Sequence, residues 1–137
     1  MPGPQRIVSL VPSTTESVCA FGAQDRLVGC TRYCTHPERG LDGVVRVGGT
    51  KNPDRERVLA LAPDLVLGNA EENRPEDLEW LGARVPMLVQ TPRTVREAVA
   101  SLRVLSLALG EPRPAVVAEV ERAVAQLAAF SGAPVRP

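Results

Sequence analysis

The residues from Gly29 to Pro37 read G-C-T-R-Y-C-T-H-P and place two of the three cysteines beside the single histidine and the single tyrosine. Thiols and an imidazole are good zinc ligands, but a structural zinc site usually has four ligands with paired spacing. Here Cys30, Cys34 and His36 supply three. Cys30 also ends a strand that we expect to be buried, which would separate it from Cys34. The stretch therefore does not predict an intrinsic metal site, and whether His36 or Cys34 contacts the metal of a bound ligand stays open.

Catalytic chemistry finds little support in the sequence. The cysteines lack the Cys-x-x-Cys spacing of a thioredoxin-like redox site. Nucleophilic catalysis needs a base and a group that orients it, and the chain has one histidine without an evident partner. The segment Gly48-Gly49-Thr50-Lys51 lacks the Gly-x4-Gly-Lys spacing of a phosphate-binding loop. We therefore expect no enzymatic activity, with a small cytosolic α/β enzyme as an alternative.

Short apolar runs alternate with helix-like stretches along the chain, which is typical of βαβ units. Ser13 with Glu16, and Thr94 with Glu97, match the capping box that begins a helix. The pattern predicts an α/β fold: an open, mostly parallel sheet of four to five strands with helices on both faces, followed by a long C-terminal helix. We expect strands at 7–11, 27–30, 64–67 and 87–89, a short extended piece at 44–47, and helices beginning at Ser13, Asn52-Pro53, Pro75, Thr94 and Pro114.

Length and charge exclude several classes of protein. The 137 residues suit one domain, and 16 basic residues balance 16 acidic ones, so no overall field attracts nucleic acid. The residues before Pro12 form neither the apolar core of a signal peptide nor a membrane span. The sequence as written therefore predicts a cytoplasmic location.

In parallel sheets of this type, ligands gather at the carboxyl ends of the strands, where the βα loops lie. Tyr33 would offer a flat ring and a hydroxyl to such a ligand, although an ordinary half-exposed surface tyrosine explains it equally well. Glu71 and Glu72 are rim carboxylates that either face solvent or pair with arginines of a docking partner. The loops that qualify are 12–14, 31–37, 48–52, 68–74 and 90–93.

Three segments resemble a known family in sequence and order: R-I-V-S-L-V-P-S-T-T-E, L-V-G-C-T-R-Y-C-T-H-P and V-G-G-T-K-N-P-D-R-E-R-V-L-A-L-A-P-D-L-V-L. They are similar to the N-terminal lobe of the helical-backbone (type III) substrate-binding proteins of ABC importers, the cobalamin-binding branch most of all. The resemblance implies two lobes that are joined by one long helix and hold the ligand between them. It divides this chain into a Rossmann-like ligand-binding lobe at 6–111, the start of the connecting helix at 112–131, and a tail at 132–137.

The resemblance also implies which residues meet the ligand. Tyr33 falls where cobalamin-binding relatives place an aromatic residue against the corrin ring, and Thr50 and Lys51 fall in a second cleft loop, where relatives often carry a tryptophan that this chain lacks. Glu72 falls, within a residue, on an acidic position that docks on the importer's membrane subunit. The ligand-binding candidates are Ser13, Thr14, Arg32, Tyr33, Thr50, Lys51 and Asn69, and the partner-binding candidates are Glu71 and Glu72.

The expected ligand is thus a metal chelate: a corrinoid, with an iron-siderophore or haem as the alternatives. We expect no intrinsic cofactor and no nucleic-acid partner. The family typically works outside the cytoplasm, and the resemblance implies that a second lobe or self-association completes the site. A protein-interaction module that uses the Glu71 and Glu72 loop is the remaining alternative.

Overall fold

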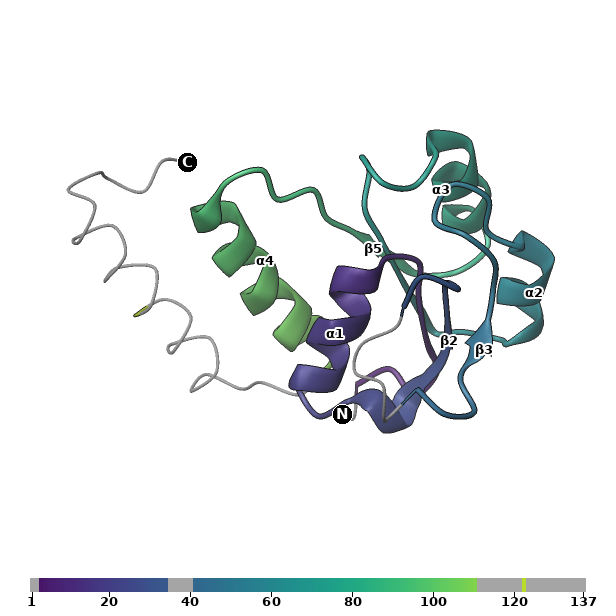
Figure 1. The fold of residues 1–137 in the computed structure, drawn as a ribbon, viewed down its shortest axis with the longest axis horizontal. Helices are drawn as coiled ribbons and strands as arrows, with labels where there is room; N and C mark the ends of the chain where they lie inside the picture. Colours follow the sequence, from purple (N-terminus) through teal and green to yellow (C-terminus); the bar gives the residue numbers. More distant parts are fainter. Residues whose placement is uncertain (1–2, 35–40, 111–121, 123–137) are drawn as a thin grey trace.

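The computed structural model describes residues 3–34, 41–110 and 122. A five-stranded sheet runs through the described residues in the order β3-β2-β1-β4-β5, and all neighbouring strands are parallel. This confirms the α/β class and the open parallel sheet. The strands are β1 (Ile7–Ser9), β2 (Leu27–Cys30), β3 (Val45–Arg46), β4 (Leu65–Gly68) and β5 (Met87–Val89) (Figure 1).

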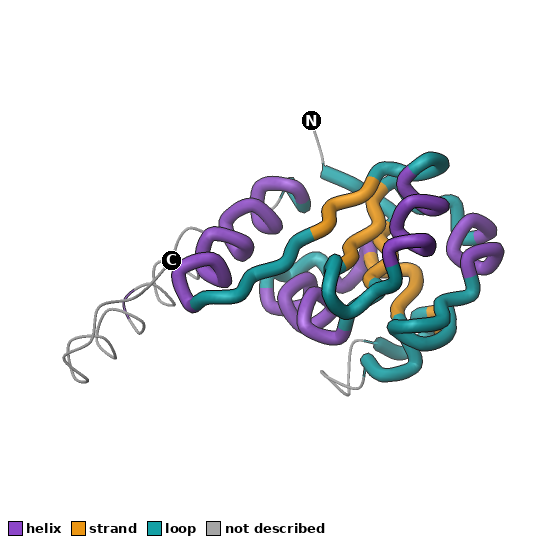
Figure 2. Tube along the Cα trace, turned by 90° about the horizontal axis from the view of Figure 1, so that it is seen from above, coloured by secondary structure: helices purple, strands orange, loops and turns teal. Residues whose placement is uncertain are grey.

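Helices cover both faces of the sheet, as the sequence predicts. The helices α1 (Pro12–Ala20) and α4 (Val95–Ala108) pack on one face, and α2 (Arg55–Ala60) and α3 (Pro75–Gly82) on the other. Figure 2 shows the strands between these two helical layers. A three-residue 3-10 helix, Gln24–Arg26, precedes β2.

The alternation of side chains along β1 assigns its residues to two separate cores. Ile7 packs in one cluster with Phe21 and Leu105, whereas its neighbour Val8 packs in the other with Val58. Both strand residues are fully buried. A strand with helices on both sides must be apolar on both faces, which explains why its sequence is a continuous apolar run.

The predicted N-cap of α1, Ser13, is wrong by two residues. Pro12 occupies the first turn and Val11 is the N-cap, with no side-chain cap, because the fixed φ of proline suits the first helical position. Ser13 therefore lies inside the helix and does not cap it. The hydroxyl of Thr14 donates a hydrogen bond of 3.0 Å to the carbonyl oxygen of Val11, and β1 ends at Ser9.

The predicted start of α2 is also wrong. Asp54 is the N-cap, and its carboxylate accepts a hydrogen bond of 3.1 Å from the N–H of Arg57. Pro53 lies outside the helix because it forms an isolated bridge with Gly48. The prediction for α4 is confirmed at its cap, where the hydroxyl of Thr94 accepts from the N–H of Glu97 at 3.1 Å.

The helix that the sequence predicts from Pro114, the domain limits beyond 110, and His36 all lie outside the described residues. Within the described part of the chain, no helix is both long enough and apolar enough to span a bilayer.

Two leucines on α4 test whether this helix is held by the sheet-facing core. Leu105 is 2% exposed and Leu107 is 72% exposed. We expect Leu105→Ala to lower the free energy of unfolding by about 2–5 kcal/mol, because it leaves a cavity in the core. The matched control Leu107→Ala should change it by less than about 0.5 kcal/mol. Urea unfolding followed by circular dichroism measures both, and equal losses would contradict the packing of α4 described above.

Candidate functional site

One buried side chain, that of Asn73, joins the loops at the carboxyl ends of three strands. Its side chain is 1% exposed. Its Oδ1 accepts a hydrogen bond of 2.9 Å from the N–H of Asn69. Its Nδ2 donates to the carbonyl oxygens of Leu10, at 3.2 Å, and Thr50, at 3.0 Å. The amide therefore fixes the loops after β1, β3 and β4 relative to one another.

Charged groups extend this connection toward β5. The Nζ of Lys51 donates a hydrogen bond of 2.7 Å to the carbonyl oxygen of Glu71. The carboxylate of Glu71 forms an ion pair of 2.9 Å with Arg93, which lies in the loop after β5. Both groups of this pair are more than half exposed, so the pair is worth little in stability. The two contacts nevertheless bring Lys51, Glu71 and Arg93 together on the rim.

The two partner-binding candidates differ in their surroundings. The Oδ1 of Asn69 accepts hydrogen bonds from the N–H groups of Glu71, at 2.8 Å, and Glu72, at 3.1 Å, and this shapes the turn that carries both carboxylates. Glu71 already pairs with Arg93. Glu72 is exposed and forms no ion pair with any described residue. Glu72 is thus the carboxylate that is available to a partner.

Tyr33 stands at the same rim with 55% of its surface exposed. The guanidinium of Arg32 lies 5.1 Å from the centroid of its ring, and Nη2 of Arg32 donates a hydrogen bond of 3.3 Å to the tyrosine hydroxyl. The backbone N–H of Arg32 donates to the carbonyl oxygen of Gly48 at 2.9 Å. A Cβ built on Gly49 would lie 3.1 Å from Nη2 of Arg32. The loop with Arg32 and Tyr33 therefore lies against the loop that leads to Thr50.

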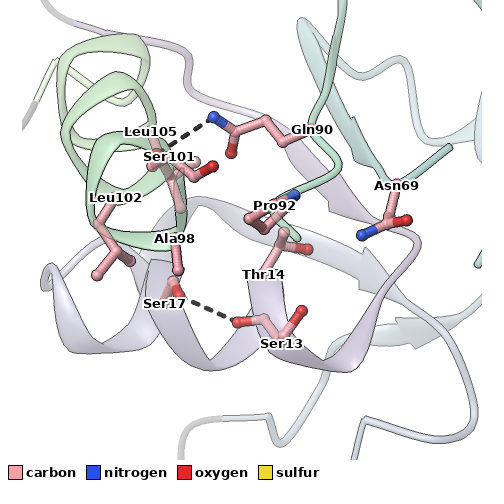
Figure 3. A pocket seen from close by; sticks show the side chains of 10 residues that line it. All are labelled: Ser13, Thr14, Ser17, Asn69, Gln90, Pro92, Ala98, Ser101, Leu102 and Leu105. Atoms are coloured by element: carbon pink, nitrogen blue, oxygen red, sulfur yellow. Dashed lines mark hydrogen bonds between the residues drawn. The ribbon is translucent and has the colours of Figure 1, made fainter. Parts of the chain in front are cut away.

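The remaining candidates, Ser13, Thr14 and Asn69, line a cavity of about 200 Å³ beside this rim. Figure 3 shows that the cavity lies between α1, α4 and the loops after β4 and β5. Hydroxyls and amides line the side of α1 and the loops, and α4 contributes two leucines, an alanine and the hydroxyl of Ser101. The Nε2 of Gln90 donates to the carbonyl oxygen of Ser101 at 3.2 Å. The other lining residues are Ser17, Pro92, Ala98, Leu102 and Leu105.

The strand order explains why these loops meet. The chain passes from β1 to β2 and β3 on one side, and then crosses to β4 and β5 on the other. The loops after β1 and β4 consequently diverge to opposite faces and leave a crevice between them, which is where open α/β sheets bind ligands. Ser13 and Thr14 follow β1, and Asn69 follows β4. The structure thus divides the candidates into a group over β2 and β3, which includes Tyr33, and a group at the crevice.

The expected separation of Cys30 and Cys34 is wrong. Both side chains are buried, and Nη1 of Arg46 donates to the sulfur of Cys30 at 2.8 Å and to the carbonyl oxygen of Cys34 at 2.7 Å. A turn closed by the N–H of Cys34 and the carbonyl oxygen of Thr31, at 3.2 Å, brings Cys34 back to the end of β2. Among the described residues, no group of three or more His, Cys, Asp or Glu side chains is arranged to hold a metal ion.

Sequence reasoning missed the role of Asn73. Two asparagines four positions apart, Asn69 and Asn73, flank the acidic pair in a loop between a strand and a helix. That spacing is a usable signal, because asparagine side chains commonly hydrogen-bond to the backbone of such loops. The contacts with Leu10 and Thr50 span 63 and 23 residues, so local pattern could not have found them.

Comparisons with known proteins give a consistent result. A sequence profile described as "Periplasmic binding protein" matches residues 7–133. A vitamin B12-binding protein of Pectobacterium carotovorum subsp. carotovorum (strain PC1) is 32% identical over 113 residues, which are 82% of this chain and 41% of that protein.

Two solved structures are similar in fold as well as in sequence. The periplasmic vitamin B12 binding protein BtuF of Vibrio cholerae is 27% identical with a TM-score of 0.76, over 92% of this chain and 49% of that chain. A periplasmic heme binding protein from Pseudomonas aeruginosa is 34% identical with a TM-score of 0.76, over 87% of this chain and 43% of that chain. The chain therefore spans less than half the length of each of these proteins.

The joining role of the buried Asn73 amide can be tested by replacing its side-chain nitrogen with oxygen. Asn73→Asp keeps the acceptor oxygen but replaces the donor nitrogen with an oxygen that faces the carbonyl groups of Leu10 and Thr50. We expect a loss of at least about 2 kcal/mol in the free energy of unfolding, because one buried and one partly buried acceptor lose their donor. Asn52→Asp adds the same charge at an exposed rim position and should cost less than about 0.5 kcal/mol. Equal stability of the two variants in urea would contradict a joining role for Asn73.

Proposed function

Because the chain belongs to the periplasmic binding protein family, we propose that it forms one lobe of a receptor that binds a metal chelate for an ABC-type uptake system. The proposed ligand is a corrinoid. The observation that carries this proposal is the rim itself, where hydrogen bonds join the loops after β1, β2, β3 and β4 and leave Tyr33 exposed. The proposed role is binding, and the matched relatives support it because they are named as binding proteins.

The side chains at this rim suit a flat macrocycle with polar arms. Aromatic residues make up only 3% of the chain, yet Tyr33 places one of them in solvent at the rim. An exposed aromatic ring stacks well on a planar ligand. Hydroxyls and an amide from Ser13, Thr14 and Asn69 line the adjoining cavity, and such groups bind the carboxamide arms of a corrinoid by hydrogen bonds.

Haem is the second candidate, and the position of Arg32 favours it. The guanidinium lies over the ring of Tyr33, where it would meet the edge of a macrocycle stacked nearby. Guanidinium groups pair strongly with carboxylates, which haem carries and a corrinoid's carboxamide arms do not. The similarity to a periplasmic heme binding protein supports this alternative.

We place the docking of a membrane subunit at Glu72. Its exposed carboxylate projects from a turn that Asn69 holds by two hydrogen bonds, so the charge is presented at low entropic cost. Glu71 would contribute less, because Arg93 already pairs with it. A basic pocket on an importer subunit is the complementary surface.

The proposed setting is periplasmic, in place of the cytoplasmic location that the N-terminal residues suggest. The name of the matched family supports this setting. Since the chain covers 41% of a curated relative, we propose that a second lobe supplies the opposite side of the ligand site.

The proposed ligand is tested by titrating the purified chain with cobalamin and with haem, followed by absorbance and calorimetry. We expect saturable binding of cobalamin that Tyr33→Ala weakens by about ten- to a hundredfold, because truncation of a central aromatic contact typically costs about 1.5–3 kcal/mol. Tyr33→Phe keeps the ring and should retain affinity within about threefold.

The same titration contains its own control. Val89→Ala removes an exposed apolar side chain at the end of β5 and should leave affinity unchanged. Absence of a saturable signal with both ligands would overturn the proposed function. Tight haem binding without cobalamin binding would select the second candidate, and Arg32→Gln should then weaken it.

The docking proposal is tested with a vitamin B12 importer permease reconstituted in lipid nanodiscs. We expect Glu72→Lys to weaken capture of the chain at least about tenfold, because a lost attraction becomes a repulsion, and capture should fall as salt rises. Glu79→Lys makes the same charge change at an exposed position on α3 and serves as the control. Identical capture of both variants would remove Glu72 from the interface.

A further inference from the structure

Two cysteine side chains meet in the interior beneath the rim. Cys30 ends β2, and Cys34 closes the turn that follows. They are 0% and 1% exposed, and the turn places the sulfur of Cys34 3.3 Å from the hydroxyl of Thr31, the residue that follows Cys30. All three cysteines are free in this structure, and the third, Cys19, is only partly buried on α1.

The surroundings of this thiol pair are more polar than packing requires. The Nη1 of Arg46 donates hydrogen bonds to the sulfur of Cys30 at 2.8 Å, and to the carbonyl oxygens of Thr31, at 3.1 Å, and Cys34, at 2.7 Å. Arg46 is opposite Cys30 in the pairing of β2 with β3. On the other side, the hydroxyls of Thr15 and Thr31 lie 3.1 and 3.3 Å from the sulfur of Cys34. Cysteines that act only as small apolar residues do not need a cation and two hydroxyls.

These contacts separate the acidities of the two thiols. The hydrogen bond from Cys30 lowers the pKa of Cys34 to about 6, with help from the hydrogen bonds of Thr15 and Thr31 and against the effect of burial. The same hydrogen bond and burial raise the pKa of Cys30, while Arg46 acts to lower it. These contacts therefore favour the thiolate at Cys34 over the thiolate at Cys30. This is the arrangement of a nucleophilic cysteine beside a resolving cysteine.

We propose that Cys30 and Cys34 form a reversible disulfide by exchange with an external small-molecule disulfide. The sulfur of Cys34 attacks one sulfur of the external disulfide, and one thiolate leaves. The thiol of Cys30 then loses its proton to that thiolate, attacks the sulfur of Cys34 and releases the second half of the external disulfide as a thiolate, which solvent protonates. The protein loses one proton and two electrons, and the external disulfide takes these together with one proton from solvent to become two thiols. Because both cysteines are buried, exchange needs local opening of the turn.

The location gives this bond a structural consequence. The turn between the two cysteines carries Arg32 and Tyr33, and Arg46 holds its carbonyl groups from beneath. A cross-link across the turn would fix the rim segment that bears the exposed ring. Periplasmic proteins, the class named by the family profile, work in an oxidising compartment where such a bond persists.

The test is a redox titration of the 137-residue chain in buffers of reduced and oxidised glutathione. Samples are quenched with acid, alkylated in denaturant, and analysed by intact mass and peptide mapping. We expect an excess of oxidised glutathione to protect two of the three cysteines from alkylation, with a linked peptide that joins Cys30 to Cys34. Dithiothreitol should restore alkylation of all three.

Variants sharpen the result. In Cys19→Ser, excess oxidised glutathione should protect both remaining cysteines from alkylation, because they are the proposed pair. In Cys30→Ser, no internal cross-link should form, and glutathione should remain attached to Cys34. Peptide mapping of the unaltered chain decides the question even where a variant fails to fold. Three alkylatable cysteines at every glutathione ratio, or a link that joins Cys19 to Cys34, would overturn the proposal.

Discussion

The hydrogen bonds of one buried amide set the arrangement of the candidate site. An amide is the side-chain group that accepts on one atom and donates twice on another, and Asn73 uses both functions to join backbone groups of three loops. A hydroxyl or a carboxylate could not replace it at that point without leaving a buried carbonyl unpaired. The rim loops are thus held from the interior, and their outward side chains need not serve the fold.

This constraint works because the sheet topology brings the three loops together. All five strands are parallel, so their carboxyl ends share one edge. The chain adds β2 and β3 on one side of β1 and β4 and β5 on the other, which leaves a crevice between the loops after β1 and β4. The two cores on either side of β1 fix the register of the central strand. A slip of one residue would move Ile7 and Val8 to the wrong cores, which makes the position of the loops as definite as the packing.

The sequence was sufficient for the features that depend on neighbouring residues. Apolar runs between proline and glycine predicted the strands, and Thr94 with Glu97 predicted the start of α4. Local rules failed where two of them competed. Pro12 took the first helical position and displaced Ser13 from its expected cap, and Pro53 was used in a bridge with Gly48.

Contacts between residues that are far apart in the sequence could not be predicted from it. The joining role of Asn73 depends on loops that meet only in the folded sheet. The meeting of Cys30 with Cys34 required a turn whose direction the spacing does not reveal. In contrast, the resemblance to a known family assigned Tyr33, Thr50 and Lys51 to cleft loops, and the structure places the loop with Arg32 and Tyr33 against the loop that leads to Thr50.

The same division between interior and rim bears on how the proposed lobe would recognise a ligand and a partner. Backbone carbonyls and buried side chains already fix the turns that carry Tyr33 and Glu72, while the ring and the carboxylate themselves stay exposed. Binding to either group therefore orders little of the chain, and less of the interaction energy is lost to ordering. The ring suits a flat apolar surface and the carboxylate a basic one.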